Sequence, residues 1–131
     1  MFLRILIPTV LAIGLTAAPA SAFLSRNNLL VVPEGGDTFN MPCRGESGDS
    51  EFWCAAGDYV QNFLGLPGST RIWRLSEPPR RRGEGIRFSL SPEGAASRTG
   101  LALFSSGPPG SALALTATGV CPPRIGRFNN N

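Results

Sequence analysis

The fold of this chain is decided by one stretch, DSEFWCAAGDYVQNFLG at positions 49–65, which has the clearest helix pattern in the sequence. Asp49 or Ser50 can cap its first amides, and Gly65 ends it. At 100° per residue, its large apolar side chains share one broad face. That face consists of Phe52, Trp53, Ala56, Tyr59, Val60, Phe63 and Leu64. Burying it is expected to be the largest apolar contribution to folding.

Cys54 lies on the flank of this helix, away from the aromatic face. Asp58 and Gln61 share that flank, so we expect Asp58 to be solvated. Cys54 is therefore predicted to meet a segment that crosses the helix.

The first 22 residues read as a secretory signal peptide. Arg4 supplies the positive start, residues 5–18 the apolar centre, and Ala22 the end of a small-residue cleavage site. We expect the mature chain to begin at Phe23 and to be periplasmic or secreted. The alternative is an uncleaved membrane anchor, but the apolar run is shorter than the ~20 residues that a span needs. No transmembrane span is expected in the mature chain.

Three cysteines remain after cleavage, and an oxidising compartment should pair two of them. Loop closure gives roughly 3 kcal/mol for Cys43 with Cys54 and roughly 4 kcal/mol for Cys54 with Cys121, which is too close to decide. We favour Cys54 with Cys121, because this bond ties the end of the chain to the helix. Cys43 with Cys54 is the competitor, and it would leave Cys121 free.

Short alternating segments predict strands around the helix. A short hairpin or one bent edge strand is expected from 29–32 and 39–41. Further strands are expected at 70–76, 86–90 and 101–105, whereas 23–28 is expected to be loose and 122–131 a disordered tail. Residues 111–118 fit a strand or a capped Ala-rich helix, and we favour the helix slightly. The predicted fold is a single α+β domain over 23–121. It has an antiparallel meander of three to four strands with one helix packed on one face, stapled by a disulfide.

The sequence offers few residues suited to catalysis or metal binding. The chain has no His, which excludes Ser-His-Asp and Cys-His relays. Asp49, Glu51 and Asp58 are better explained by capping and solvation than by acid-base work. The cysteine spacing matches no zinc pattern. We predict a non-enzyme without cofactor or metal, with an unfamiliar His-free enzyme as one alternative.

The run Arg80, Arg81 and Arg82 is the most suggestive surface feature. It could bind an anionic ligand or an anionic envelope surface, with added charge from Arg71, Arg74 and Arg87 on adjoining strands. Glu77 and Glu84 flank it, so we favour a solvated hairpin tip. Without Arg4 the chain has eleven Arg against nine acids, a net charge of +2 that is too weak for nucleic-acid binding.

Trp73, between two of these arginines, could stack on a sugar or base. We favour a core position, because a Trp on a strand more often covers a neighbouring core.

The segment FWCAAGDY at 52–59, with RFSLSP at 87–92, resembles a group of small exported proteins from high-GC Gram-negative bacteria. The resemblance spans roughly the predicted helix through the predicted strand at 101–105, and it implies export and a central place for Cys54. It supplies no activity, ligand or partner. We therefore expect a secreted or periplasmic domain with a binding or structural role.

Overall fold

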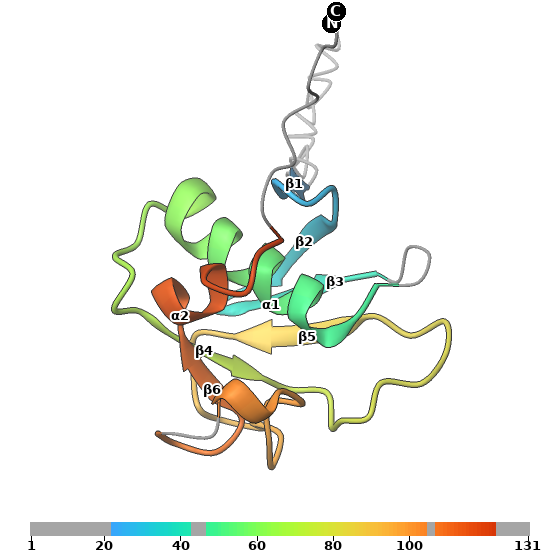
Figure 1. The fold of residues 1–131 in the computed structure, drawn as a ribbon. Helices are drawn as coiled ribbons and strands as arrows, with labels where there is room; N and C mark the ends of the chain where they lie inside the picture. The colour runs from blue at the N-terminus through green and yellow to red at the C-terminus, as the bar shows by residue number, and fades with distance from the viewer. Residues whose placement is uncertain (1–21, 43–46, 105–106, 123–131) are drawn as a thin grey trace, which may run out of the picture.

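The computed structural model describes residues 22–42, 47–104 and 107–122, and it contains one six-stranded antiparallel sheet (Figure 1). The strand order is β1-β2-β3-β5-β4-β6. The strands are β1 (Phe23–Leu24), β2 (Leu30–Gly35), β3 (Thr38–Met41), β4 (Arg71–Arg74), β5 (Ile86–Ser89) and β6 (Ser111–Leu113).

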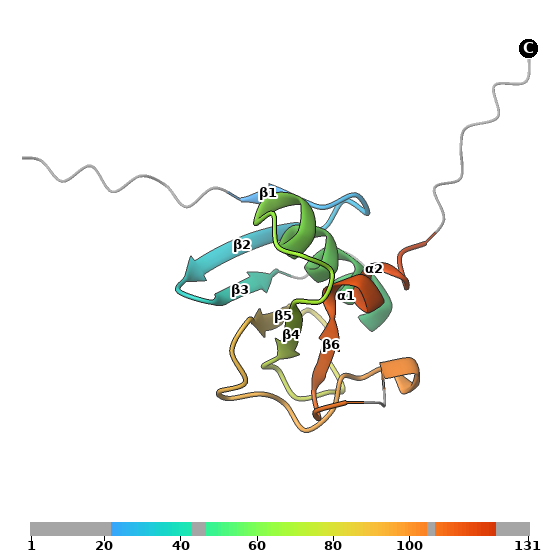
Figure 2. The same cartoon turned by 90° about the vertical axis from the view of Figure 1, so that its left-hand side faces the viewer.

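Helices cover one face of this sheet. The helix α1 (Asp49–Asp58) continues into a π-helical turn, η1 (Tyr59–Phe63), and the short α2 (Ala114–Thr118) packs beside α1. A 3-10 turn, η2 (Ala102–Phe104), lies with the loops at the β4 and β6 end of the sheet, far from β1 (Figure 2).

The predicted α+β class, antiparallel pairing and packed helix are confirmed, but the strand count and the meander are wrong. The sheet has six strands, and β5 lies between β3 and β4 instead of following β4 at the edge. Register explains this order, since Phe88 of β5 pairs with both Phe39 and Arg74 and completes a core-facing row.

The aromatic face of α1 forms the centre of the core. Phe52, Trp53 and Val60 are fully buried. The ring of Trp53 meets the edge of Phe88 with centroids 4.9 Å apart, and that of Phe104 at 5.4 Å. These perpendicular ring contacts are a favourable geometry, so α1 is fixed against both β5 and η2.

The ends of the helix differ from the prediction. The N-cap is Gly48, not Asp49 or Ser50, and the Glu51 carboxylate accepts a hydrogen bond from the Gly48 amide at 3.0 Å. The π turn changes the helical phase after Asp58, so Phe63 stays 43% exposed. Gly65 has a φ of +67°, in keeping with its predicted role as the stop.

Asp58 is buried, contrary to the prediction that it is solvated. Its carboxylate accepts hydrogen bonds from the backbone amide of Arg26 at 2.8 Å and from Nδ2 of Asn62 at 2.6 Å. The residues before β2 fold over this flank, which therefore lies inside the protein.

A disulfide joins Cys54 to Cys121, the pair favoured from the sequence, with Cα atoms 4.8 Å apart. It ties α1 to the segment that follows α2. The two helices approach closely because Gly57 has no side chain; a Cβ there would lie 2.8 Å from the Ala114 carbonyl oxygen. Cys43, the competing partner, lies outside the described residues.

Three further segments differ from the sequence prediction. Residues 23–24 are not loose but pair with β2 as a strand. The strand predicted over 101–105 does not form in its described part, because η2 occupies 102–104, and Leu103 is 81% exposed. The ambiguous segment 111–118 is both: β6 pairs with β4, and α2 follows directly.

The predicted signal peptide over 1–22 lies outside the described residues except for Ala22, and so does the predicted tail except for Pro122. Within the described part of the chain, no helix is long and apolar enough to cross a bilayer.

Candidate functional site

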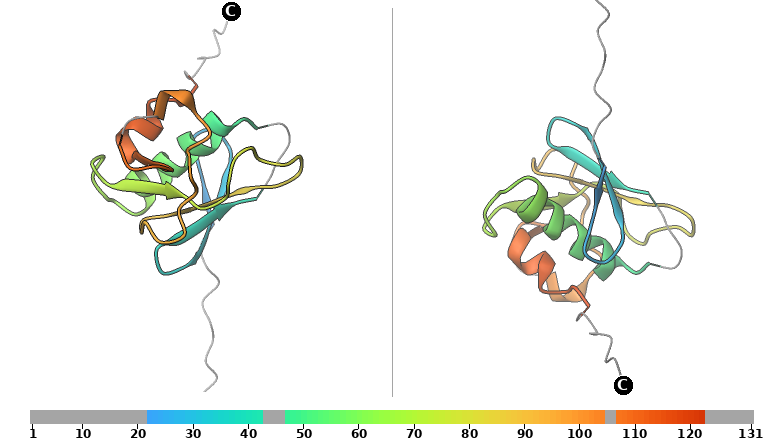
Figure 3. Two further views of the ribbon diagram at one scale, coloured as in Figure 1. Left: turned by 90° about the horizontal axis from the view of Figure 1, so that it is seen from below. Right: turned by 90° about the horizontal axis from the view of Figure 1, so that it is seen from above.

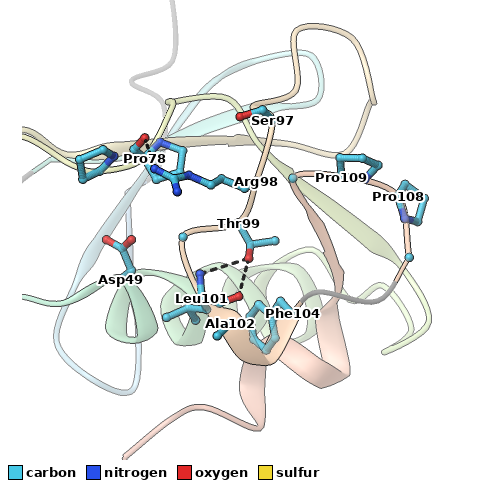
Figure 4. A pocket seen from close by; sticks show the side chains of 14 residues that line it. Asp49, Pro78, Ser97, Arg98, Thr99, Leu101, Ala102, Phe104, Pro108 and Pro109 are labelled. Atoms are coloured by element: carbon cyan, nitrogen blue, oxygen red, sulfur yellow. Dashed lines mark hydrogen bonds between the residues drawn. The ribbon is translucent and has the colours of Figure 1, made fainter.

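A pocket of about 620 Å³ opens beside the start of α1 (Figure 4). Its walls come from the loop over 97–101, η2, the turn over 107–110 and the two prolines that follow β4. We call it the proline-lined pocket, because Pro78, Pro79, Pro108 and Pro109 line it. Its other lining residues include Asp49, Ser97, Arg98, Thr99, Leu101 and Phe104.

The apolar part of the pocket rests on the core. Phe104, 7% exposed, lies between the pocket and Trp53. The Trp53 indole nitrogen donates to the Thr99 carbonyl oxygen at 3.0 Å. The side chains of the pocket are therefore backed by packed aromatic rings and not by mobile surface groups.

Two charged side chains, Asp49 and Arg98, line the same pocket (Figure 4). Nη2 of Arg98 donates to the Pro78 carbonyl oxygen at 3.2 Å. Oδ2 of Asp49 accepts from Nη1 of Arg74 at 3.0 Å. No ion pair joins Asp49 to Arg98 in the structure as described. The pocket thus carries separate negative and positive groups.

Arg74 lies behind the pocket and is fully buried. It belongs to the core-facing row of the sheet, opposite Phe88. Its Nη1 also donates to the Thr99 carbonyl oxygen at 3.0 Å, and its Nε donates to the Ser76 carbonyl oxygen at 2.6 Å. Nη2 has no hydrogen-bond partner among the described residues. Arg74 thereby joins β4, α1 and the pocket loop through one guanidinium.

Gly100 allows the pocket loop to approach this ion pair. Its φ is +86°, and an ideal Cβ there would lie 2.5 Å from Nη1 of Arg74 and still closer to Oδ2 of Asp49. Any side chain at this position would therefore push the loop away from Asp49 and Arg74.

The outer edge of the pocket loop is held by Glu77. Its carboxylate accepts from the Ser97 amide at 2.6 Å and from the Ser97 hydroxyl at 2.8 Å. These hydrogen bonds hold the pKa of Glu77 below its ordinary value of 4.5, and the bond from the Ser97 hydroxyl contributes most to this shift.

The predicted arginine cluster is not assembled as expected. Arg80 is held by the carbonyl oxygens of Glu84 at 2.7 Å and Ser47 at 2.6 Å, and its guanidinium lies 5.0 Å from the ring centroid of Phe52. Arg81 and Arg82 are exposed on a connection that projects from the body of the protein (Figure 3).

The strand arginines do not add their charge to this loop in the expected way. Arg74 is buried, Arg71 donates to the Ser111 hydroxyl at 3.0 Å, and Arg87 pairs with Glu34 at 2.6 Å. Trp73 is half-buried on the opposite face of β4 from Arg74 and is not part of the core cluster, contrary to the prediction.

Sequence reasoning missed the proline-lined pocket. The pairs Pro78-Pro79 and Pro108-Pro109 are local signals for rigid loops, but no sequence pattern indicates that the two loops line one pocket. Asp49 was assigned to the helix start, without its Arg74 partner 25 residues away.

Comparisons with protein-family models, curated proteins and solved structures give no match for this chain. Among the residues described, no cluster of three or more His, Cys, Asp or Glu side chains could hold a metal ion.

Proposed function

We propose that this protein is an exported, non-enzymatic binding protein that holds a small ligand in the proline-lined pocket. The observation that carries this proposal is the composition of the pocket: rigid apolar rings on a packed base, with a few charged and hydroxyl groups at the wall. Ligand sites typically have this mixture, and about 620 Å³ falls within their usual range of roughly 300–1,000 Å³.

Binding is favoured over catalysis by the groups that the pocket offers. Asp49 is its one carboxylate among the described residues, and this carboxylate is already bonded to Arg74. General acid-base catalysis by carboxylates usually requires two of them placed around the reacting bond. The absence of His from the whole sequence removes the usual neutral-pH base.

A blocking variant tests the binding proposal. Ala102 is exposed and lines the pocket, so Ala102→Trp should fill it without disturbing the core. We would screen a library of small apolar acids, amines and amino acids by ligand-observed NMR against the wild type and this variant. Leu115→Trp, at an exposed position on α2 that does not line the pocket, is the matched control.

Hits that are lost in Ala102→Trp and kept in Leu115→Trp support a pocket ligand. Hits that survive in both variants, or no hits, contradict the proposal.

Export is supported by the leader-like start of the sequence and by the Cys54–Cys121 bond, since disulfides persist in oxidising compartments. Peptide mapping without reductant on protein recovered outside the cytoplasm tests it. We expect a mature N-terminus at Phe23 and an intact Cys54–Cys121 peptide pair, whereas material found only in the cytoplasm with Met1 retained would contradict export.

Arg81 and Arg82 support a second candidate function, contact with an anionic envelope surface, because they are exposed on the projecting connection. Sedimentation with anionic vesicles at low salt, repeated with Arg81→Ser/Arg82→Ser, tests it. Unchanged sedimentation of that variant would remove this function.

A further inference from the structure

The two charged groups of the proline-lined pocket have unequal partners. Asp49 is bonded to Arg74 through Oδ2, while its Oδ1 has no partner among the described residues, and its side chain is 21% exposed. Arg98 uses one of its five N–H donors on the Pro78 carbonyl oxygen, and its residue is exposed. Each group therefore keeps polar atoms for a ligand.

These charges lie beside an apolar wall. Pro108, Pro109, Leu101 and Phe104 line the rest of the same pocket (Figure 4). A proline ring has no N–H to offer, so this wall favours an apolar part of a ligand. The wall and the charges together define a pocket for a molecule with one apolar part and one polar part.

The charge balance decides which polar part fits. A purely anionic ligand would bind Arg98 but would cover Oδ1 of Asp49 without donating a hydrogen bond to it. A purely cationic ligand would cover Arg98 without offering it an acceptor. Asp49 keeps its ion pair with Arg74, but its Oδ1 and the remaining N–H groups of Arg98 would lose water without gaining a hydrogen-bond partner, which costs binding free energy. A ligand that carries both an ammonium and a carboxylate satisfies both groups.

We infer that the ligand of this pocket is a zwitterion with an apolar body, an apolar amino acid or a short apolar peptide with both termini free. The carboxylate binds the Arg98 guanidinium, the ammonium binds Oδ1 of Asp49, and the apolar side chain lies on the proline and Phe104 wall. This inference rests on the proposed function and narrows its ligand class.

Capped peptides test the inference without altering the protein. The probes are Leu-Phe, acetyl-Leu-Phe, Leu-Phe amide and acetyl-Leu-Phe amide, titrated by isothermal calorimetry and by amide chemical shifts. We expect Leu-Phe to bind at least tenfold more tightly than either singly capped form, and the doubly capped form to bind most weakly. Free leucine, titrated in parallel, distinguishes an amino-acid site from a peptide site.

Variants then assign each terminus to its residue. In Arg98→Gln, amidation of the carboxylate should cost no further affinity, and in Asp49→Asn, acetylation of the amine should cost none. Arg81→Gln, on the projecting connection, is the control and should behave as wild type. Because Asp49→Asn also alters the bond to Arg74, its thermal stability is measured alongside, and the Arg98→Gln result stands independently of it.

The outcomes separate the two proposals. If all four peptides bind in the pocket with equal affinity, the zwitterion inference is overturned while the pocket remains a binding site. If neither leucine nor any of the peptides shifts the amides of residues 97–102, the zwitterion inference is overturned. The binding proposal then depends on the library screen alone.

Discussion

Nη1 of Arg74 donates to Oδ2 of Asp49 over 3.0 Å, and this bond joins the core-facing side of the sheet to the first residue of α1. The same Nη1 donates to the carbonyl oxygen of Thr99 in the pocket loop. One buried cation thus positions the helix, the sheet and the pocket relative to one another.

We predict that the two partners of this ion pair differ in their importance for stability. Asp49→Ala leaves a fully buried guanidinium without its carboxylate and should lower the free energy of unfolding by about 3 kcal/mol. Arg74→Met removes the buried charge and leaves Asp49 partly exposed at a helix N-terminus, where a carboxylate is favourable, so it should cost about 1 kcal/mol.

Urea unfolding of both variants and of the double variant measures these costs. The dependence of the unfolding free energy on urea concentration should not change in these variants. The double variant should lose less unfolding free energy than the sum of the losses in the two single variants. A larger cost for Arg74→Met than for Asp49→Ala would be inconsistent with this role for the pair.

Gly100→Ala is predicted to disrupt the same contact from the loop side. The added Cβ meets Arg74 and Asp49, and alanine is strained at a φ of +86°, so we expect a loss of about 3 kcal/mol or more. Gly36→Ala is the matched control, because Gly36 also has a positive φ of +57° but has no atom within 4 Å of an added Cβ.

The control variant should lose only about 1 kcal/mol, the cost of the left-handed backbone. Equal losses in thermal unfolding for the two variants would mean that the loop does not pack against the ion pair as described.

Loss of the Cys54–Cys121 bond should destabilise the protein by about 4 kcal/mol, because it closes a loop with a sequence separation of 67 residues. The double variant Cys54→Ala/Cys121→Ala, compared with wild type by calorimetry, measures this. Cys43→Ser is expected to leave the transition unchanged. An unfolding temperature that falls as much in Cys43→Ser as in the double variant would argue against this pairing.

Acid is predicted to loosen the pocket loop through Glu77. Its pKa is lowered in the folded protein by the Ser97 hydroxyl and amide, so its contribution to stability is present above the ordinary value of 4.5 and is lost as the pH falls through the lower folded value. We expect the Ser97 amide to become less protected from hydrogen exchange as the pH falls below 4.5 and through the lower folded pKa of Glu77.

Ser97→Ala removes one of the two donors and should raise the pKa of Glu77 toward 4.5, as measured by NMR titration of its carboxyl carbon. A pKa that does not change in this variant would show that the hydroxyl is not the main cause of the shift.

Local patterns predicted the elements in which apolar side chains repeat with the period of a helix or of a strand. The aromatic face of α1, the stop at Gly65 and the hairpin of β2 and β3 all follow from short-range periodicity and turn chemistry. The alternation of Ile86 and Phe88 likewise identified β5.

What could not be predicted depends on pairings between distant residues. The position of β5 is set by its register with both β3 and β4, and no local pattern records that register. The side of β4 that faces the core was predicted wrongly for the same reason. Trp73 looks like the natural core residue, yet Arg74 turns inward because Asp49 and the Thr99 carbonyl receive it.

The pocket could not be predicted from the sequence, because loops form it. Its walls come from segments that the sequence separates by tens of residues, and loops have no periodic signal that would bring them together.

The measurement that most directly tests the account is a chemical-shift map of the ¹⁵N-labelled protein titrated with Leu-Phe. We predict saturable shifts at the amides of residues 97–102, 107 and 110, which disappear in Ala102→Trp. Saturable shifts confined to other surfaces, with these amides unmoved, would contradict the claim that the proline-lined pocket binds a zwitterionic ligand.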